Sequence, residues 1–182
     1  MEVSSVYKGR PDDVRSEVEE RVYRLLDEVG IGFNRIDHDD AETMEDCDVI
    51  GRVLGARICK NLFLCNSQKT DFYLLMMPAD KPFKTKLLSP QLGCSRLSFA
   101  PPEIMQGLIR CTPGSASLAG LVFDAEKRVT LVIDRELKNE DKIGLHPCKN
   151  TSSLALSSAD IFGKLIPALG HEPHFVDLTL TE

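Results

Sequence analysis

Three short polar segments interrupt apolar stretches of the chain, and each carries groups that could bind or activate a substrate. The first is Lys60-Asn61, inside the apolar run CKNLFLC. A lysine ammonium at the rim of a pocket can meet a phosphate or a carboxylate. The alternative is a surface lysine whose aliphatic stem covers apolar residues while its ammonium stays in water. The residue types alone leave both interpretations open.

The second segment is a loop of small residues, Gly114-Ser115-Ala116-Ser117, which follows Pro113. Small side chains let the backbone approach a ligand closely, and consecutive amides in such a loop can bind an oxyanion. A turn that is merely rich in glycine and serine is the alternative. The segment matches neither the G-x-x-x-x-G-K phosphate-binding loop nor the G-x-S-x-G nucleophile elbow.

The third segment is His146-Pro147-Cys148-Lys149-Asn150-Thr151, at the end of a predicted strand. Its histidine could position or deprotonate a substrate, although a structural histidine is the alternative. Cys111 or Cys148 could also act with His146 as a thiol hydrolase. Neither cysteine lies at a helix N-terminus beside a basic activator, which disfavours that hypothesis.

Two histidine-containing clusters have residue types that can bind a metal, but neither is predicted to be a metal site. Four adjacent polar residues, Asp37-His38-Asp39-Asp40, cannot all point at one ion, so a solvated acidic turn is expected there. His171 and His174 flank a turn after the last predicted helix and are interpreted as structural. The sequence predicts no metal and no cofactor.

Composition and charge limit the class of protein. The 182 residues are 42% hydrophobic and 27% charged, which is typical of a globular protein. The six cysteines form no C-x-x-C pair, no apolar run reaches the roughly 20 residues of a membrane span, and the N-terminus lacks the apolar core of a signal peptide. We therefore expect a soluble protein of the reducing cytoplasm.

The net charge of −6 argues against binding along a long nucleic-acid backbone. It still permits contact with one short single-stranded end, for which a few lysines suffice. Lys81, Lys84 and Lys86 form a local basic cluster. Solvated surface lysines are the default interpretation, and a modest phosphate grip beside Lys60 is the alternative.

Hydrophobic periodicity and turn residues predict the elements that position these segments. Helices are expected over 11–29, 46–54, 84–92, 102–108 and 159–169. Strands are expected over 31–38, 59–65, 72–77, 96–99, 129–134, 143–148 and 175–178, with a loop over 112–120. This order indicates one α/β domain over 1–182, with a central mixed β-sheet flanked by helices and residues 1–10 as a loose N-terminal extension.

Taken in order, the motifs KNLFL, YLLMMPADKPFK, RLSFA, TPGSASLAGL and LHPCKNTSSLAL, with GHEPHFVDL after a helix, resemble the YbaK/ProX superfamily of aminoacyl-tRNA editing domains. Within it, the chain is most similar to the free-standing alanyl-tRNA(Pro) deacylase branch (ProXp-ala or PrdX). The resemblance runs from about residue 11 to the C-terminus. It implies a trans-editing hydrolase that removes alanine from mischarged tRNA(Pro).

The resemblance also implies roles for the three segments. Lys60, Gly114, Ser115 and His146 become the candidate catalytic residues, and Asn61, Ala116, Ser117, Asn150 and Thr151 the candidate substrate-binding residues. The lysine would hold the terminal phosphate or adenosine, the loop amides would surround the ester carbonyl, and the histidine would position the aminoacyl group. The implied partners are the tRNA acceptor end and, among proteins, prolyl-tRNA synthetase or an elongation factor.

One departure from the family pattern concerns specificity. Leu118-Ala119 stand where the family loop usually has proline and then phenylalanine or leucine. Pocket size is therefore open, and a deacylase for cysteinyl- or seryl-tRNA is an alternative. A non-catalytic tRNA-binding module of the same fold is another.

Overall fold

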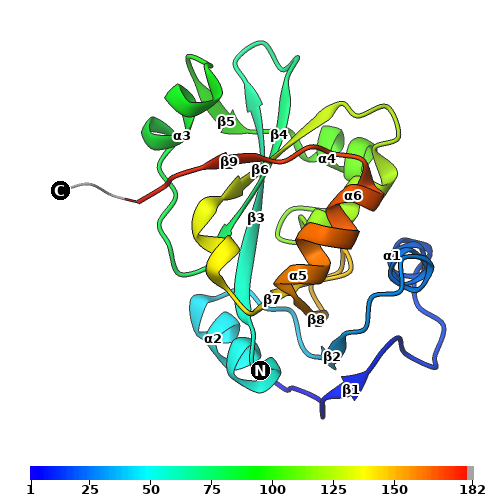
Figure 1. Cartoon of the computed structure of the whole chain (residues 1–182). Coiled ribbons are helices and arrows are strands. Elements are labelled where there is room, and N and C mark those ends of the chain that lie inside the picture. The colour runs from blue at the N-terminus through cyan, green and yellow to red at the C-terminus, as the bar shows by residue number, and fades with distance from the viewer. Residues whose placement is uncertain (180–182) are drawn as a thin grey trace.

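The computed structural model describes residues 1–179, which form a nine-stranded mixed sheet with helices packed against it (Figure 1). The strands are β1 (Tyr7–Lys8), β2 (Asn34–Asp37), β3 (Arg57–Asn66), β4 (Phe72–Pro78), β5 (Leu97–Phe99), β6 (Val129–Asp134), β7 (Lys142–Leu145), β8 (Ser152–Ser157) and β9 (His174–Val176). The sheet order is β1-β2-β8-β7-β3-β4-β6-β9, and β5 pairs with β3. This mixed α/β architecture confirms the expected fold class.

The helices follow the same chain order. They are α1 (Glu17–Glu28), α2 (Met44–Leu54), α3 (Thr85–Leu92), α4 (Pro102–Ile109), the 3-10 helices η1 (Leu118–Phe123) and η2 (Arg135–Asn139), and a last helix built from α5 (Ser158–Asp160), a π-helical turn η3 (Ile161–Leu165) and α6 (Ile166–Leu169). No helix among residues 1–179 has both the length and the apolar character needed to cross a membrane.

The sheet opens along one edge of β3. Its other edge pairs continuously with β4, from Cys59 to Cys65. On the opening side, β7 runs parallel to β3 for only two pairs, of which Ile58↔Gly144 is the last. Further along, β5 takes up the same edge, beginning at Leu64↔Phe99. The strands thus separate between residues 59 and 63, where Lys60 and Asn61 lie.

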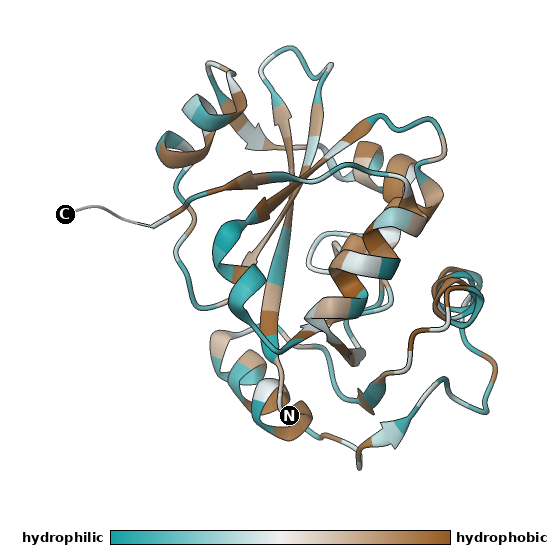
Figure 2. Cartoon of the chain, in the orientation of Figure 1, coloured by the Kyte–Doolittle hydropathy of each residue, from teal (hydrophilic) through white to brown (hydrophobic). Residues whose placement is uncertain are grey.

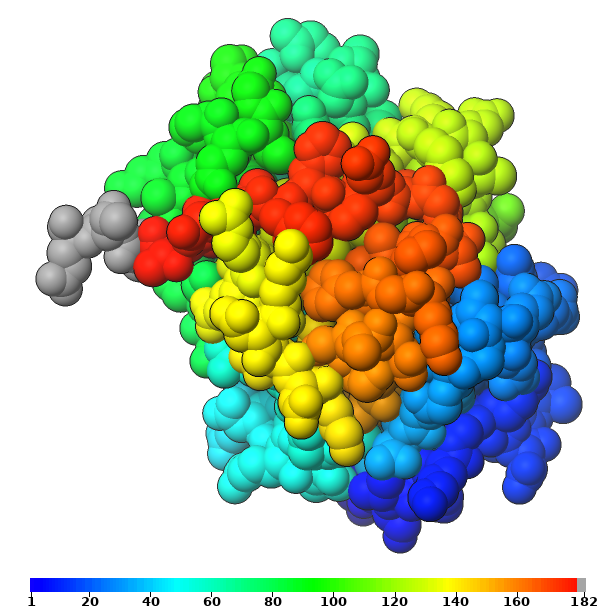
Figure 3. Space-filling view, viewed as in Figure 1, coloured from blue at the N-terminus to red at the C-terminus, as the bar shows by residue number. Residues whose placement is uncertain are grey.

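Apolar side chains fill three clusters around the sheet, and Figure 2 shows the brown strands at the centre. The largest cluster joins the sheet to α1, α4, η1 and the last helix. A second cluster lies under α3 and includes Leu64, Leu88 and Val176. In the third, Ile50 and Leu54 of α2 pack on Ile36 of β2. The last helix and β9 lie across the face shown in Figure 3, between α1 and α3.

Two N-terminal features differ from the expectations. Helix α1 begins at Glu17 rather than residue 11 because Ser16 and Glu19 form a capping box, and Val14 is left 92% exposed. Residues 1–10, expected as a loose extension, contain β1, which pairs with β2 through Tyr7↔Arg35.

The strand β8 was not predicted. It lies between β2 and β7 and is almost wholly buried. Two of its serines are bonded to distant side chains, Ser152 to Asp37 and Ser153 to His38. Burying serine hydroxyls costs little free energy when they are hydrogen-bonded. Their partners here are distant in sequence, so the local sequence did not indicate a buried strand.

Candidate functional site

The three polar segments converge where β3 and β7 separate. Lys60 and His146 each lie two residues beyond the Ile58↔Gly144 pair, so both lie just past the point where the two strands diverge. The loop 112–117 is tied to the same place, because the Ser117 hydroxyl donates a 2.6 Å hydrogen bond to the carbonyl of His146. The structure therefore brings together segments that are far apart in the sequence.

Two polar side-chain atoms at this opening are buried without a partner. Among residues 1–179, neither Nδ1 of His146 nor Oδ1 of Asn61 has a hydrogen-bond partner. Burial lowers the pKa of His146 to about 4, with a smaller contribution from His38, so its imidazole is neutral at pH 7. Leaving such groups unpaired costs stability unless a ligand completes them, so both atoms are candidate contacts to a bound molecule.

The serine hydroxyls of the loop are already engaged. Ser115 Oγ accepts from the Thr112 amide at 2.9 Å and donates to the Thr112 carbonyl at 2.9 Å. Ser117 Oγ accepts from the Ala119 amide at 3.2 Å while it donates to His146. Both serines are buried, and their bonds fix the loop conformation. This geometry assigns the hydroxyls to support of the loop and not to nucleophilic attack.

The backbone amides of the loop are free to act. Within the described chain, no acceptor pairs with the N–H of Gly114 or of Ala116. Gly114 has a φ of +84°, a conformation that L side chains rarely adopt. The loop packs tightly at its far end, because a Cβ on Gly120 would lie 2.7 Å from the Ile109 carbonyl oxygen. A rigid loop with unpaired amides is suited to holding an oxyanion.

Lys60 is half-buried, and its ammonium donates to the backbone carbonyl of Lys81. Burial lowers the pKa of Lys60, and Asp80 opposes this shift. Lys60 also lies beside α2: burial raises the pKa of Cys47, and the Lys60 charge counteracts that rise. Within the described residues, the Lys60 ammonium forms no ion pair with a carboxylate. Its other two N–H groups can therefore donate to a ligand phosphate.

Lys81 is already neutralised by two acidic side chains. Its ammonium pairs with Asp134 at 2.7 Å and with Glu136 at 2.8 Å. Lys84 and Lys86 are exposed. Of the predicted basic cluster, only these two lysines can offer a charge to a ligand without breaking an ion pair.

The other two predicted substrate-binding residues anchor the turn. The side-chain amide of Asn150 donates to the Ala41 carbonyl at 2.7 Å. The carbonyl of exposed Thr151 accepts from the His38 amide at 3.0 Å. Both contacts hold the turn 146–151 against the segment that leads into α2.

His38 is a neighbour of the site that the sequence did not reveal. It is 9% exposed, and its Nε2 lies 2.8 Å from the Ser153 hydroxyl. Asp37 is bonded to both Arg15 and Arg35. The expectation of a solvated acidic turn at 37–40 was therefore wrong for His38, which is buried and bonded to β8, and for Asp37, which is half-buried in ion pairs with two arginines. Only the pairing with β8, distant in sequence, gives His38 its place.

The thiols near the site are enclosed. Cys111 and Cys148 are each 1% exposed, and the Cys111 thiol donates to the Ile109 carbonyl at 3.3 Å. A hydrogen bond to Cys111, together with burial, raises the pKa of Cys148 well above its usual range. The same contact lowers the pKa of Cys111, but both thiols are enclosed. A thiol that a substrate cannot reach is a poor nucleophile, so this packing gives no support to the thiol-hydrolase alternative.

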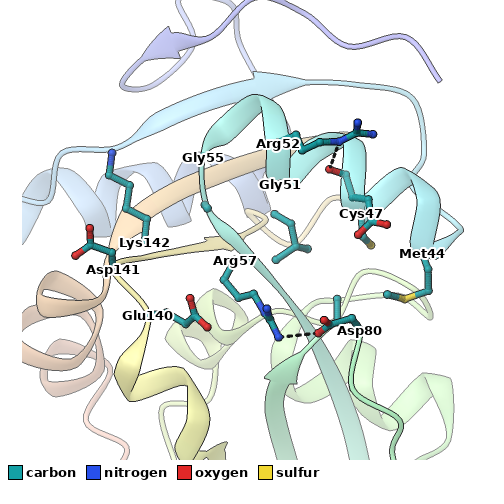
Figure 4. A pocket seen from close by; sticks show the side chains of 14 residues that line it. Met44, Cys47, Gly51, Arg52, Gly55, Arg57, Asp80, Glu140, Asp141 and Lys142 are labelled. Carbon is teal, nitrogen blue, oxygen red and sulfur yellow. Dashed lines mark hydrogen bonds and ion pairs between the residues drawn. The ribbon is translucent and has the colours of Figure 1, made fainter.

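A surface cavity of about 440 Å³ lies next to the opening, between α2, the start of β3 and the end of β4 (Figure 4). Arg57 reaches across it and donates to Asp80 at 2.9 Å. Ile58 belongs to its lining, but Lys60, Asn61 and His146 do not. The cavity therefore adjoins the candidate site without containing it.

The part of the chain that the structure describes holds no group of three histidine, cysteine, aspartate or glutamate side chains placed to bind a metal ion. His171 is buried and bonded to Asp124 at 2.9 Å, whereas His174 is exposed. The His171 contact is a structural one, as its sequence context indicated.

Comparison with known proteins identifies the family of the chain. The model of the aminoacyl-tRNA editing domain matches residues 38–163, which is well over half of the chain and includes all three polar segments. The chain belongs to this family.

Relatives of the editing-domain family resemble the chain over most of its length. Prolyl-tRNA editing protein ProX of Acetoanaerobium sticklandii is 29% identical over 162 residues, covering 89% of this chain and 98% of that protein. Prolyl-tRNA synthetase associated domain-containing protein 1 of Danio rerio is 30% identical over 165 residues, covering 90% and 86%.

Solved structures share the fold at lower identity. A structure described as a candidate trans-editing enzyme for prolyl tRNA synthetase has a TM-score of 0.69 and 14% identity, covering 91% of this chain and all of that one. Hypothetical protein APE2540 has a TM-score of 0.66 and 18% identity, covering 86% and 98%. These likenesses show the editing-domain fold.

Proposed function

We propose that the protein is a trans-editing deacylase that hydrolyses alanyl-tRNA(Pro), with the catalytic site at the β3–β7 opening. The observation that carries the proposal is the pair of buried, unpartnered atoms there, His146 Nδ1 and Asn61 Oδ1. The neutral imidazole and the amide oxygen can both accept from the α-ammonium group of an aminoacyl ester. Membership of the editing-domain family supports this choice of substrate class.

The remaining groups suit ester hydrolysis by water. The unpaired amides of Gly114 and Ala116 would stabilise the oxyanion that forms at the ester carbonyl, an effect of about 3 to 4 kcal/mol for one donor in comparable sites. Lys60 would hold a phosphate of the terminal nucleotide. An aminoacyl ester is already activated, so positioning contributes more than a strong nucleophile would.

No carboxylate or free hydroxyl of the three segments is placed as a general base, so the proposal assigns water placement to the substrate. The free 2′-hydroxyl of the terminal adenosine lies next to the 3′-ester and can relay a proton. Water oxygen bonds to the carbonyl carbon, the bond to O3′ breaks, and O3′ receives the proton. The products are free alanine and tRNA(Pro).

The experiment compares hydrolysis of alanyl-, seryl-, cysteinyl- and prolyl-tRNA(Pro) under identical conditions. We expect alanyl-tRNA(Pro) to be hydrolysed much faster than prolyl-tRNA(Pro), because a site lined by small residues acts as a second sieve for small side chains. Equal rates for alanine and proline would overturn the editing proposal. Faster hydrolysis of the seryl or cysteinyl ester would support the deacylase reaction but would replace alanine as the proposed substrate.

A second arm uses alanyl-tRNA(Pro) ending in 2′-deoxyadenosine. We expect nearly normal binding and much slower hydrolysis. A normal rate would mean that a protein group supplies the base, and His146 would be the first residue to test. Binding of all substrates without any ester loss would instead favour a non-catalytic tRNA-binding module.

A further inference from the structure

The segment between Asp80 and Glu103 differs in charge from the rest of the chain. In a protein of net charge −6 it contains no acidic residue and four basic ones. Lys81 is neutralised by its ion pairs. Lys84, Lys86 and Arg96 are exposed, and none of them forms an ion pair within residues 1–179. Three unneutralised cations are thus concentrated around α3 and the start of β5, which adjoin each other in Figure 1.

An exposed aromatic pair lies on the same segment. Phe99 is 65% exposed, and its ring packs edge-on against Phe83 with centroids 6.4 Å apart and an interplanar angle of 64°. Phe83 packs against the apolar cluster under α3, so it holds the Phe99 ring in place. A large aromatic face that stays in water beside cations is typical of surfaces that stack nucleobases. We call Phe83, Phe99, Lys84, Lys86 and Arg96 the aromatic ridge.

The aromatic ridge is connected to the candidate site through β3. Phe99 lies directly opposite Leu64, so the two side chains share one face of the sheet. Lys60 is on that same face, four residues away, or about 13 Å along the strand. The Lys60 ammonium is bonded to the Lys81 carbonyl, two residues before Phe83. A strand of nucleic acid whose end reaches Lys60 would therefore pass over the ridge.

We propose that the aromatic ridge binds the unpaired 3′ end of the substrate tRNA, with a base stacked on Phe99 and phosphates contacted by Lys84, Lys86 and Arg96. This rests on the proposed function for the identity of the RNA. Stacking faces and cations suit a single strand, whose bases are open on both sides, better than a duplex. Asp177 contacts α3 only at its C-terminal end, where its backbone amide donates to the side-chain oxygen of Gln91 at 2.8 Å. Its carboxylate accepts from the Thr179 amide and pairs with none of the ridge cations within residues 1–179.

The test uses an RNA hairpin that carries no amino acid and has a single-stranded 3′ tail ending in CCA. Its binding is measured by fluorescence anisotropy and compared with that of the same hairpin with a blunt end. Phe99→Leu keeps an apolar side chain without an aromatic face, whereas Phe99→Trp keeps the face. We expect Phe99→Leu to weaken binding of the tailed hairpin about 5- to 100-fold and Phe99→Trp to retain it. Binding of the blunt hairpin should be weaker and insensitive to both changes.

The charges are tested by the salt dependence of the same binding. Replacing Lys84, Lys86 and Arg96 together by alanine should reduce the slope of log affinity against log salt by about 2, from about 0.7 for each contact. Arg24→Ala, which removes an exposed arginine from α1, is the matched control and should leave the slope unchanged. Circular dichroism checks that every variant is folded.

Unchanged binding in Phe99→Leu, or an equal loss for the tailed and blunt hairpins, would overturn the proposal. A ridge that serves a protein partner would also give unchanged RNA binding. Ester hydrolysis is measured separately on alanyl-tRNA(Pro). If the protein binds the tailed hairpin through Phe99 but does not hydrolyse alanyl-tRNA(Pro), only the proposed function is overturned. If it hydrolyses alanyl-tRNA(Pro) but its RNA binding does not depend on Phe99, only the role of the ridge is overturned.

Discussion

Two histidines of this protein occupy sites with opposite hydrogen-bonding character. His171 is 6% exposed, with Nε2 2.9 Å from Asp124 and Nδ1 2.9 Å from the Leu169 carbonyl. His146 contacts no carboxylate within the described residues, and its Nδ1 has no partner. Both ring nitrogens of His171 therefore lie against oxygen atoms of the protein, whereas one ring nitrogen of His146 has no partner.

The difference separates groups that hold the fold from groups that are available to a ligand. Asp124 also accepts from the amides of Arg128 at 3.0 Å and Val129 at 2.8 Å, so the His171 region is a complete network. At His146 a buried nitrogen is left unpaired, which costs about 1 to 3 kcal/mol of stability. A substrate that supplies the missing bond recovers that free energy as binding energy.

The largest expected effect comes from breaking the complete network. Asp124→Ala should lower the free energy of unfolding by about 3 to 5 kcal/mol, because it leaves the His171 imidazole and two amides buried without their acceptor. Urea denaturation at pH 7 measures this. Asp12→Ala, at an exposed aspartate, is the control and should change stability by less than about 0.5 kcal/mol. A loss below 1 kcal/mol in Asp124→Ala would contradict the structural role.

The second effect concerns activity and should leave the fold intact. His146→Ala should lower kcat/KM for alanyl-tRNA(Pro) about 10- to 100-fold, the value of one hydrogen bond to a charged group. His171→Ala is the matched variant: at a temperature where it remains folded, it should keep most of the activity while losing stability. Equal losses of activity in the two variants would contradict the assignment of His146 to the substrate and of His171 to the fold.

The smallest effect is the pH dependence of stability. The pKa of His146 is about 4 in the folded protein and about 6.5 in an unfolded chain, so the unfolded state binds the extra proton first as the pH falls. Stability contributed by the neutral imidazole is therefore present above pH 6.5 and is lost between pH 6.5 and 4. Between pH 7 and pH 5, the wild type should lose about 1 to 2 kcal/mol more than His146→Ala in urea denaturation. Parallel losses would mean that His146 is not held neutral by burial.

Much of the fold could be predicted from local sequence, and the exceptions have a common cause. Strands β3, β4 and β6 were expected within two residues of their observed bounds, because β3 and β4 contain long apolar runs and β-branched residues dominate β6. The missed strand β8 and the buried His38 depend on each other through the Ser153 bond, across 115 residues of sequence. Periodicity carries no information about such a pairing.

The candidate site was predicted in a similar, partial way. Motif order indicated that Lys60, the 114–117 loop and His146 belong together, and the structure joins the last two through Ser117. The supporting roles of Ser115 and Asn150 could not be predicted, because their partners are a backbone carbonyl and amide in the loop and a backbone carbonyl before α2. Every residue has a backbone carbonyl, and every residue except proline has an amide N–H, so the residue types do not indicate which backbone groups will bond to these side chains.

The position of β8 between β2 and β7 also determines when the site can assemble. The β3–β4 hairpin closes over a short turn and can form early, whereas β2 must wait for a strand more than 100 residues later. During synthesis, a chain that has not yet reached residue 152 already carries Lys60 and the 114–117 loop but has no strand to hold His38 and the 146–151 turn together. We therefore expect the opening to be completed among the last steps of folding, after the ribosome has released nearly the whole polypeptide.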